Sequence, residues 1–241
     1  MKILVLGHKG MLGHMVYKYF NEKTNYEILT INSRWSDENF VRNVLSFNGD
    51  YIINCIGAIH QKTKNFEVNV DLPIWLDNNC NKSRLIHSDT DFEMDNSKYG
   101  ISKKNAYDYI TKFGQFTKII KTSIFGPELN GKNSLFEWFM NSKNEIYGWS
   151  ENYWNGITTL QWSIISHDMI LNWDKYSLTN IPSTKCISKY ELLNLIKDVF
   201  NKKIIIHKNS DMIVNRCLKG TLKVSNIRNQ IVELKEFYYG N

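Results

Sequence analysis

Proline and long hydrophobic runs are both scarce in this sequence. Only three of the 241 residues are proline, so the usual markers of linkers and domain boundaries are few. No apolar run approaches the roughly 18 residues of a membrane-spanning helix. The first residues, MKILVLGHKG, run from an apolar stretch into glycines without a small-residue cleavage site. These absences argue against an integral membrane protein and predict a cytoplasmic one.

Cysteine is also sparse. Cys55, Cys80, Cys186 and Cys217 stand far apart, no two of them form a C-x-x-C pair, and the histidines do not cluster with them. This spacing argues against a zinc site and against a disulfide framework. It predicts reduced thiols and no bound metal.

No block of like charge occurs in the chain. The net charge of +6 arises from 30 Lys and Arg against 24 Asp and Glu, and the basic residues are dispersed. This excess favours an anionic partner, and a phosphorylated small molecule satisfies it as well as a nucleic acid does. Because no motif that reads nucleic acid appears, we expect no nucleic-acid partner.

The sequence is rich in short apolar runs separated by helical lengths. Its 241 residues, 42% of them hydrophobic, suffice for one large domain or for a domain with a small appendage. Strand and helix alternate in the first half, which predicts an α/β fold with a Rossmann-type, doubly wound parallel sheet over residues 1–126. The buried strands are expected at residues 2–6, 26–31, 50–57, 84–88 and 117–125.

The alternation weakens after residue 126. Helices are expected at 134–142 and 188–202, the second with Ser188 as N-cap and Glu191 three residues later, and a strand is expected at 203–208. We expect residues 127–241 to form a smaller substrate-binding lobe that is interleaved with the first domain.

Three glycines follow the first strand at the start of the first helix. Gly7, Gly10 and Gly13 form G-x-x-G-x-x-G. In this context the glycines permit a tight turn and let backbone N–H groups approach a pyrophosphate, while the helix N-terminus adds partial positive charge. The motif predicts a dinucleotide cofactor, and a glycine turn without a ligand is the alternative.

The end of the second strand bears on the choice of cofactor. It reads INSRWSD, with Arg34 present and the first acidic residue delayed to Asp37. An arginine at this place accommodates the 2′-phosphate of NADP, whereas an acid holds the ribose of NAD. The segment favours NADPH over NADH, unless Arg34 is only a surface cation.

Tyr99 and Lys103 lie four residues apart in the stretch SKYGISKKNAYDYI. On a helix this spacing places them on one face, where the lysine favours the phenolate and lowers the pKa of the tyrosine. Such a tyrosine can donate a proton to a carbonyl oxygen as hydride arrives. The lysine can also hold the nicotinamide ribose. The alternative is an aromatic and a cation on a solvated helix face.

Eight short segments are spread in order along nearly the whole chain: GHKGMLG (7–13), INCIG (53–57), VNVDLP (68–73), RLIHSDTDF (84–92), KYGISK (98–103), TSIFGPEL (122–129), YWNGITTLQ (153–161) and ISKYELL (187–193). Together they resemble the extended short-chain dehydrogenase/reductases, and more narrowly the dTDP-4-dehydrorhamnose reductases. The resemblance implies NADPH-dependent reduction of the C4 keto group of a nucleotide-activated 4-keto-6-deoxyhexose in deoxysugar biosynthesis. The nucleotide would be dTDP or UDP, the C2 substituent hydroxyl or acetamido, and NADH is the alternative cofactor.

The same resemblance leaves two other functions open. One is a catalytically silent, dinucleotide-binding regulatory subunit. The other is an epimerase that uses bound NAD to oxidise and re-reduce its sugar. The resemblance is compatible with a homodimer, and we expect no membrane partner.

The resemblance also implies roles for individual residues. The S-T-D segment of the family falls on residues 89–91, so Thr90 matches the hydroxyl that polarises the substrate carbonyl, with Ser88 as the rival if the register slips by two. Tyr99 and Lys103 match the acid and its partner. The cofactor contacts are expected at Gly7, Gly10, Met11, Leu12, Gly13, Arg34, Asn54, Cys55, Ile56, Gly57, Tyr99, Lys103, Thr122 and Ser123.

The substrate contacts are expected mainly in the C-terminal lobe. The resemblance implies that Trp154 stacks on a base or sugar and that Asn155 and Thr158 hydrogen-bond to the substrate. The planar fork of Arg216 suits a diphosphate, and Lys62 is a weaker candidate of the same kind. The alternatives are packing of Trp154 under the lobe and an ordinary surface charge at Arg216.

One segment departs from the family pattern. Only residues 92–98, FEMDNSK, connect Asp91 to Tyr99, where the family has a long flap that carries aromatic residues and glycines. The departure bears on how the site closes over a substrate and on the dimer contact.

Overall fold

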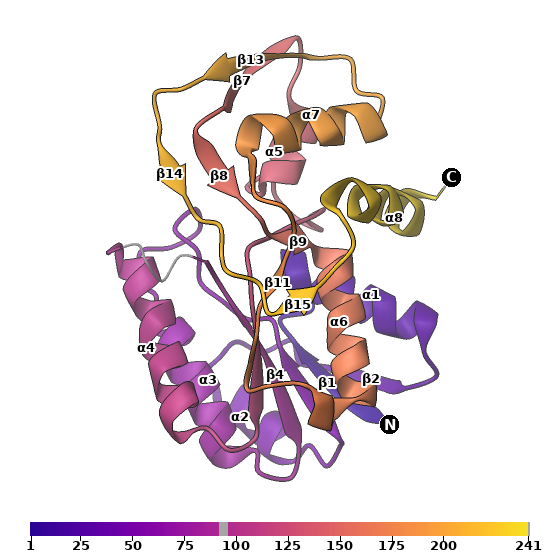
Figure 1. The fold of residues 1–241 in the computed structure, drawn as a ribbon. Coiled ribbons are helices and arrows are strands. Elements are labelled where there is room, and N and C mark those ends of the chain that lie inside the picture. Colours follow the sequence, from indigo (N-terminus) through magenta and orange to yellow (C-terminus); the bar gives the residue numbers. More distant parts are fainter. Residues whose placement is uncertain (92–95, 241) are drawn as a thin grey trace.

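The computed structural model describes residues 1–91 and 96–240, and a six-stranded sheet forms its centre (Figure 1). The strands are β1 (Lys2–Leu6), β2 (Glu27–Thr30), β3 (Tyr51–Asn54), β4 (Arg84–Asp89), β5 (Thr117–Lys121) and β10 (Thr179–Asn180). They lie in the order β10-β5-β4-β3-β1-β2, and every pairing is parallel. The predicted Rossmann-type parallel sheet is confirmed.

Helices cover both faces of this sheet. They are α1 (Met11–Lys23), α2 (Glu38–Leu45), α3 (Val68–Asn79), α4 (Lys98–Phe113) and α6 (Thr159–Leu171). Side chains alternate along β1, so Ile3 and Val5 pack with α1 and α6, whereas Leu4 and Leu6 pack with α2 and α3. Within the described ranges, no helix is both long and apolar enough to cross a membrane.

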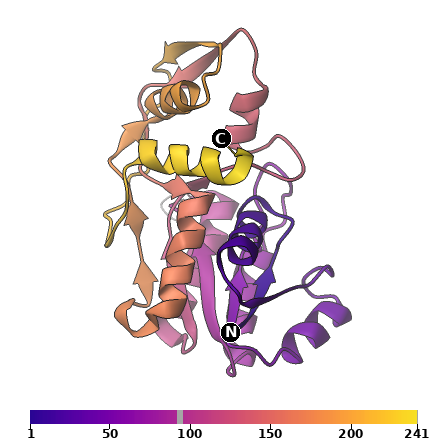
Figure 2. The same cartoon turned by 90° about the vertical axis from the view of Figure 1, so that its right-hand side faces the viewer.

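The C-terminal lobe lies over the carboxyl ends of the strands (Figures 1 and 2). Its helices are α5 (Leu135–Asn141) and α7 (Lys189–Val199), and its strands are β7 (Glu145–Trp149), β8 (Asn152–Trp154), β12 (Ile187–Ser188), β13 (Ile205–Asn209) and β14 (Val214–Asn215). Both predicted helices are confirmed, as is the Ser188–Glu191 capping box. A separate apolar cluster, built largely from α5, α7 and the final helix of the chain, holds the lobe together.

The chain crosses between the lobe and the sheet more than once. The predicted strand at 117–125 is broken, because its end forms β6 (Ile124–Phe125), which pairs with β9 (Ile157–Thr158) outside the main sheet. After β9, α6 packs on α1 and β10 joins the edge of the sheet beside β5. Two short strands, β11 (Pro182–Ser183) and β15 (Leu222–Lys223), and the final helix α8 (Ile227–Tyr239) complete the chain.

Two of the four cysteines form a disulfide, so the expectation of reduced thiols throughout is wrong. Cys186 and Cys217 are 31 residues apart in sequence, and their Cα atoms are 5.8 Å apart. Cys186 precedes β12 and Cys217 follows β14, and both strands pair with β8. This shared pairing brings the two segments together. Cys55 and Cys80 are free thiols.

Candidate active site

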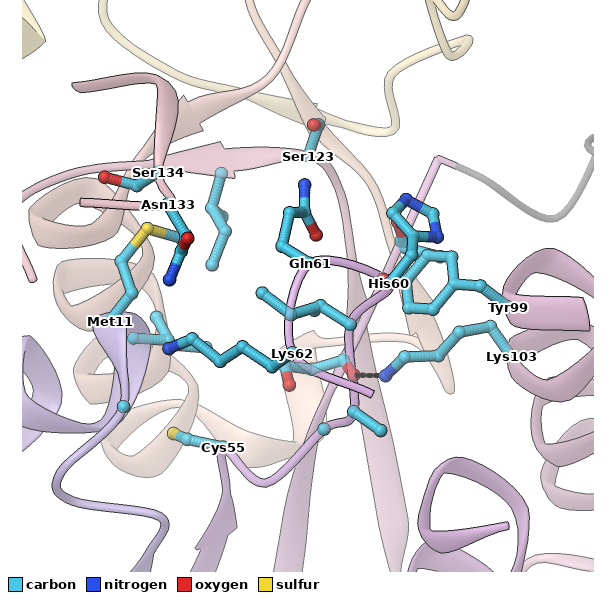
Figure 3. Close-up of a pocket in the computed structure, with 18 of the residues that line it drawn as sticks. Met11, Cys55, His60, Gln61, Lys62, Tyr99, Lys103, Ser123, Asn133 and Ser134 are labelled. Atoms are coloured by element: carbon cyan, nitrogen blue, oxygen red, sulfur yellow. Dashed lines mark hydrogen bonds between the residues drawn. The ribbon is translucent and has the colours of Figure 1, made fainter. Parts of the chain in front are cut away.

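A cavity of about 330 Å³ opens at the carboxyl ends of β1, β3, β4 and β5 (Figure 3). Its size is that of a small-molecule site, and its place is where ligands bind in parallel α/β sheets. It is lined by Gly10, Met11, Leu12, Cys55, Gly57, Ala58, Ile59, His60, Gln61, Lys62, Ser88, Asp89, Thr90, Tyr99, Lys103, Thr122, Ser123, Ile124, Glu128, Asn133, Ser134 and Leu135.

The glycine turn forms one end of this cavity. Gly7 has a φ of +79°, and a Cβ on Gly13 would lie 2.1 Å from the Gly7 carbonyl oxygen, so the turn requires glycine at both places. Gly10 is the N-cap of α1, no side chain caps this helix, and its first turn holds no acidic residue. The partial positive charge of the helix N-terminus is therefore not neutralised by the helix itself. The turn fits the diphosphate of a dinucleotide.

The expected cofactor residues divide into two groups. The cavity lining includes Gly10, Met11, Leu12, Cys55, Gly57, Tyr99, Lys103, Thr122 and Ser123. Gly7 and Gly13 shape the turn without lining the cavity. Asn54 and Ile56 also lie outside the lining. The Asn54 side chain hydrogen-bonds to His87 and accepts the backbone N–H of Ile56, and the Ile56 side chain packs against the apolar cluster formed with α2 and α3.

Arg34 lies in the segment between β2 and α2, outside the cavity lining, and its side chain is exposed. Its backbone N–H donates to the Asp37 carboxylate at 3.2 Å, while Trp35 beside it packs on Trp75. The backbone here is therefore anchored. Arg34 lies four residues beyond the end of β2, the strand next to β1.

Tyr99 stands in the first turn of α4, which is capped by the Ser97 side chain. Its ring packs edge-on against His60, with centroids 4.9 Å apart (Figure 3), and its hydroxyl hydrogen-bonds to Thr90. Burial raises the pKa of Tyr99 to about 12, the bond from Thr90 acts to lower it, and the nearby Asp89 and Asp91 raise it further. The phenol is therefore a proton donor at neutral pH.

The expected lowering of the Tyr99 pKa by Lys103 is wrong. The Lys103 side chain is buried, and its Nζ donates to the Ser88 carbonyl oxygen at 3.3 Å (Figure 3). It also lies beside Gly57, where a Cβ would be 3.7 Å from the Nζ. Tyr99 and Lys103 do lie four residues apart on one helix, but burial, which raises the pKa, has the largest effect on the Tyr99 phenol.

Thr90 and Ser88 are distinguished by their hydrogen bonds. The Ser88 hydroxyl donates to the Asn54 carbonyl oxygen at 3.2 Å, so it is engaged within the sheet. The Thr90 hydroxyl is hydrogen-bonded to Tyr99 and donates to the Asp91 carboxylate at 3.3 Å. This geometry favours Thr90 over Ser88 as the partner of the tyrosine.

Three of the expected substrate contacts are wrong, because their side chains are structural. Trp154 is 2% exposed and packs edge-on against Phe125 in the core of the lobe, so it cannot stack on a base. The Asn155 amide is used on both sides by the backbone of Leu218. Thr158 is fully buried and caps α6.

The other two expected substrate residues lie near the tyrosine or the cavity. Arg216, directly after β14, is close enough for its charge to lower the pKa values of Tyr99 and Asp91. Lys62 lines the cavity and pairs with Glu128, with Nζ and Oε1 3.5 Å apart.

Several residues of the site carried no assigned role in the sequence. Glu128 is one of them, and its carboxylate accepts the backbone N–H groups of Asn133 and Ser134, which also line the cavity. The GPEL segment of the family resemblance contains Glu128 and was its only signal. The short connection over 92–98 lies partly outside the described residues, since 92–95 are not described.

No family model matches the chain, and no curated protein matches it by sequence. Among solved structures, the dTDP-4-dehydrorhamnose reductase of Clostridium acetobutylicum is 16% identical, with a TM-score of 0.71 over 99% of this chain and 100% of that one. The dTDP-4-dehydrorhamnose reductase of Bacillus anthracis, solved with NADP, is 14% identical, with a TM-score of 0.73 over 100% and 99%.

A third solved structure has a different activity. The UDP-N-acetylglucosamine 4-epimerase of Bacillus cereus is 17% identical, with a TM-score of 0.72 over the full length of both chains. The chain therefore shares its whole fold with the two reductases and with this epimerase. The expected likeness to dTDP-4-dehydrorhamnose reductases is confirmed at the level of the fold.

Proposed function

We propose that the protein is an NADPH-dependent reductase of the C4 keto group of a nucleotide-activated 4-keto-6-deoxyhexose. The observation that carries the proposal is that one cavity brings together Thr90, Tyr99, Lys103 and a helix N-terminus bounded by glycines. A hydrogen-bonded hydroxyl pair beside a dinucleotide-type turn is what carbonyl reduction requires of a protein. The fold shared with two dTDP-4-dehydrorhamnose reductases supports the same reaction class.

The cavity offers a place for each part of the cofactor. Gly10 and Met11 would hold the diphosphate at the start of α1, Lys103 would hold the ribose, and Thr122 and Ser123 would lie beside the nicotinamide. When bound, NADPH supplies the hydride. Arg34, at the end of β2, would meet the 2′-phosphate, which is why we propose NADPH over NADH.

Tyr99 would supply the proton. Because burial keeps its phenol protonated, it can donate to the oxygen that becomes negatively charged at C4. Thr90 would donate a second hydrogen bond to the same oxygen. The diphosphate of a dTDP- or UDP-linked sugar would meet Arg216, whose charge already acts on the pKa of Tyr99, and Lys62 at the rim.

Oxidation of NADPH by the wild-type protein and by Tyr99→Phe tests the proposal directly. The substrates are dTDP- and UDP-linked 4-keto-6-deoxy sugars, including a 2-acetamido form. We expect turnover by the wild type and a loss of roughly 10²- to 10⁴-fold in kcat for Tyr99→Phe, with NADPH binding unchanged. Tyr109→Phe is the matched control, because it removes a phenol hydroxyl from the same helix outside the cavity lining.

The result also separates the competing functions. A wild-type protein that binds NADPH but turns over none of these sugars contradicts the reductase and favours a silent regulatory subunit. Tightly held NAD that copurifies with the protein, with interconversion of two sugar epimers, favours an epimerase.

A further inference from the structure

Asp91 is a buried carboxylate next to the proposed catalytic hydroxyls. Its side chain is 4% exposed, and its Oδ1 accepts a hydrogen bond from the Thr90 hydroxyl at 3.3 Å. Its Oδ2 is buried without a hydrogen-bond partner among the described residues. Leaving a carboxylate oxygen in this state is costly, so Asp91 calls for an explanation beyond packing.

The C-terminal lobe places two cations near this carboxylate. Burial raises the pKa of Asp91. The charge of Lys189 lowers this pKa, and the charge of Arg216 lowers it to a smaller extent. Lys189 is the first residue of α7, where the helix dipole disfavours a cation. Its Nζ lies 4.7 Å from the centre of the Trp154 ring, which compensates in part. The lysine is thus held in an unfavourable place, close enough to Asp91 for the two charges to interact.

A covalent link fixes both cations. Cys186 lies three residues before Lys189 and Cys217 directly follows Arg216, and the two cysteines are bonded. The disulfide therefore joins the two segments that bring positive charge to Asp91.

We propose that Asp91 is a positioning residue that holds the Thr90 hydroxyl beside Tyr99, and that Lys189 and Arg216 keep it ionised for this purpose. An ionised carboxylate can only accept a hydrogen bond, so before substrate binds the single Thr90 proton is donated to Asp91, and this bond holds the threonine oxygen beside Tyr99. When a substrate binds, the same hydroxyl can turn to the C4 oxygen. A protonated Asp91 loses this directing effect. The inference rests on the proposed reductase function.

The pH dependence follows from the charged groups around the pair. The charged and titratable groups around the pair are Asp89 on β4, His60, whose ring packs on Tyr99, Lys189 on α7 and Arg216 after β14. Burial lowers the pKa of Lys189 to about 8, so this lysine is charged throughout the acidic range. Asp91 is effective above its pKa, so kcat is lost as pH falls through that value. Because Lys189 lowers the pKa of Asp91, Lys189→Met should move the acidic limb of the kcat profile to higher pH, whereas Lys189→Arg should leave it in place.

Asp91→Asn tests the role of the carboxylate itself. We expect kcat to fall about tenfold with little change in KM, and the acidic limb to disappear, because the amide keeps an acceptor but no longer titrates. Lys185→Met and Asp211→Asn, which change exposed charges of the same lobe, serve as controls. Thermal unfolding and NADPH binding show whether each variant is folded.

A measurement without substrate separates this inference from the proposed function. Phenolate absorbs in the near ultraviolet, so a pH titration of this absorbance follows all tyrosines together. The difference between a protein and the same protein carrying Tyr99→Phe isolates the titration of Tyr99. Since Asp91 raises that pKa, Asp91→Asn should lower it. An unchanged Tyr99 titration together with a wild-type kcat profile overturns the inference. A lowered pKa in a protein that turns over no keto sugar supports the coupling of Asp91 to Tyr99 and counts against the reductase.

Discussion

Among single residues, Tyr99 determines how a reductase built on this site should respond to pH. Burial raises the pKa of Tyr99 to about 12, and its proton is needed in the direction of reduction. Its contribution is therefore fully present at neutral pH and is lost only as pH rises through that strongly alkaline range. We expect the kcat/KM for keto-sugar reduction to show no alkaline loss near pH 7 to 9. An alkaline loss between pH 7 and 9 in the wild type that the residual activity of Tyr99→Phe does not show would contradict this expectation. It would favour the lowered Tyr99 pKa that the Tyr99–Lys103 spacing suggests.

Arg34 is the residue on which cofactor preference should depend. Its guanidinium is exposed at the end of β2, and the nearest carboxylate along the segment, Asp37, is held by the backbone N–H of Arg34. We expect Arg34→Met to weaken NADPH binding by about tenfold and to leave NADH binding unchanged, because only NADPH carries the 2′-phosphate. Fluorescence titration with both cofactors measures this. Arg42→Met, an exposed arginine on α2, is the control, and equal weakening of both cofactors would contradict the assignment.

Among the elements, β12 and β14 depend on the disulfide that joins their flanking segments. The bond closes a segment whose ends are 31 residues apart, so its loss should cost about 3 to 4 kcal/mol of unfolding free energy in the chain-entropy account. We expect reductant to lower the melting temperature of the wild type. A Cys186→Ser/Cys217→Ser double variant should melt at the reduced wild-type temperature with or without reductant. This variant keeps the free thiols Cys55 and Cys80. If reductant still lowers its melting temperature, the effect of reductant on the protein does not come from the Cys186–Cys217 bond.

The same elements show where sequence reasoning succeeds and where it fails. The glycine turn, β1 and α1 follow from local patterns, because strand burial and helix periodicity are properties of neighbouring residues. The burial of Trp154 and the cysteine pair follow from the pairing of β12 and β14 with β8, which no local pattern encodes. The place of Lys189 over Trp154 has the same origin. The direction of the Tyr99 pKa depends on burial by distant elements, so residue spacing alone predicted the wrong sign.

For the whole molecule, the path of the chain should make the sheet and the lobe unfold together. The chain enters the lobe after β6, returns as α6 and β10, and leaves again, and α8 packs on α1 and α6 through Met15, Leu160 and Leu234 (Figure 2). We therefore expect one calorimetric peak whose measured enthalpy equals the van't Hoff value. NADPH at 100 times its dissociation constant should stabilise the protein by about 2.7 kcal/mol and move the entire peak, whereas GMP should not. Two peaks, of which only one responds to NADPH, would mean that the crossings between the lobe and the sheet do not couple their unfolding. Lys189 and Arg216 would then leave Asp91 when the lobe unfolds, and the acidic limb of the kcat profile should move to higher pH at temperatures between the two peaks.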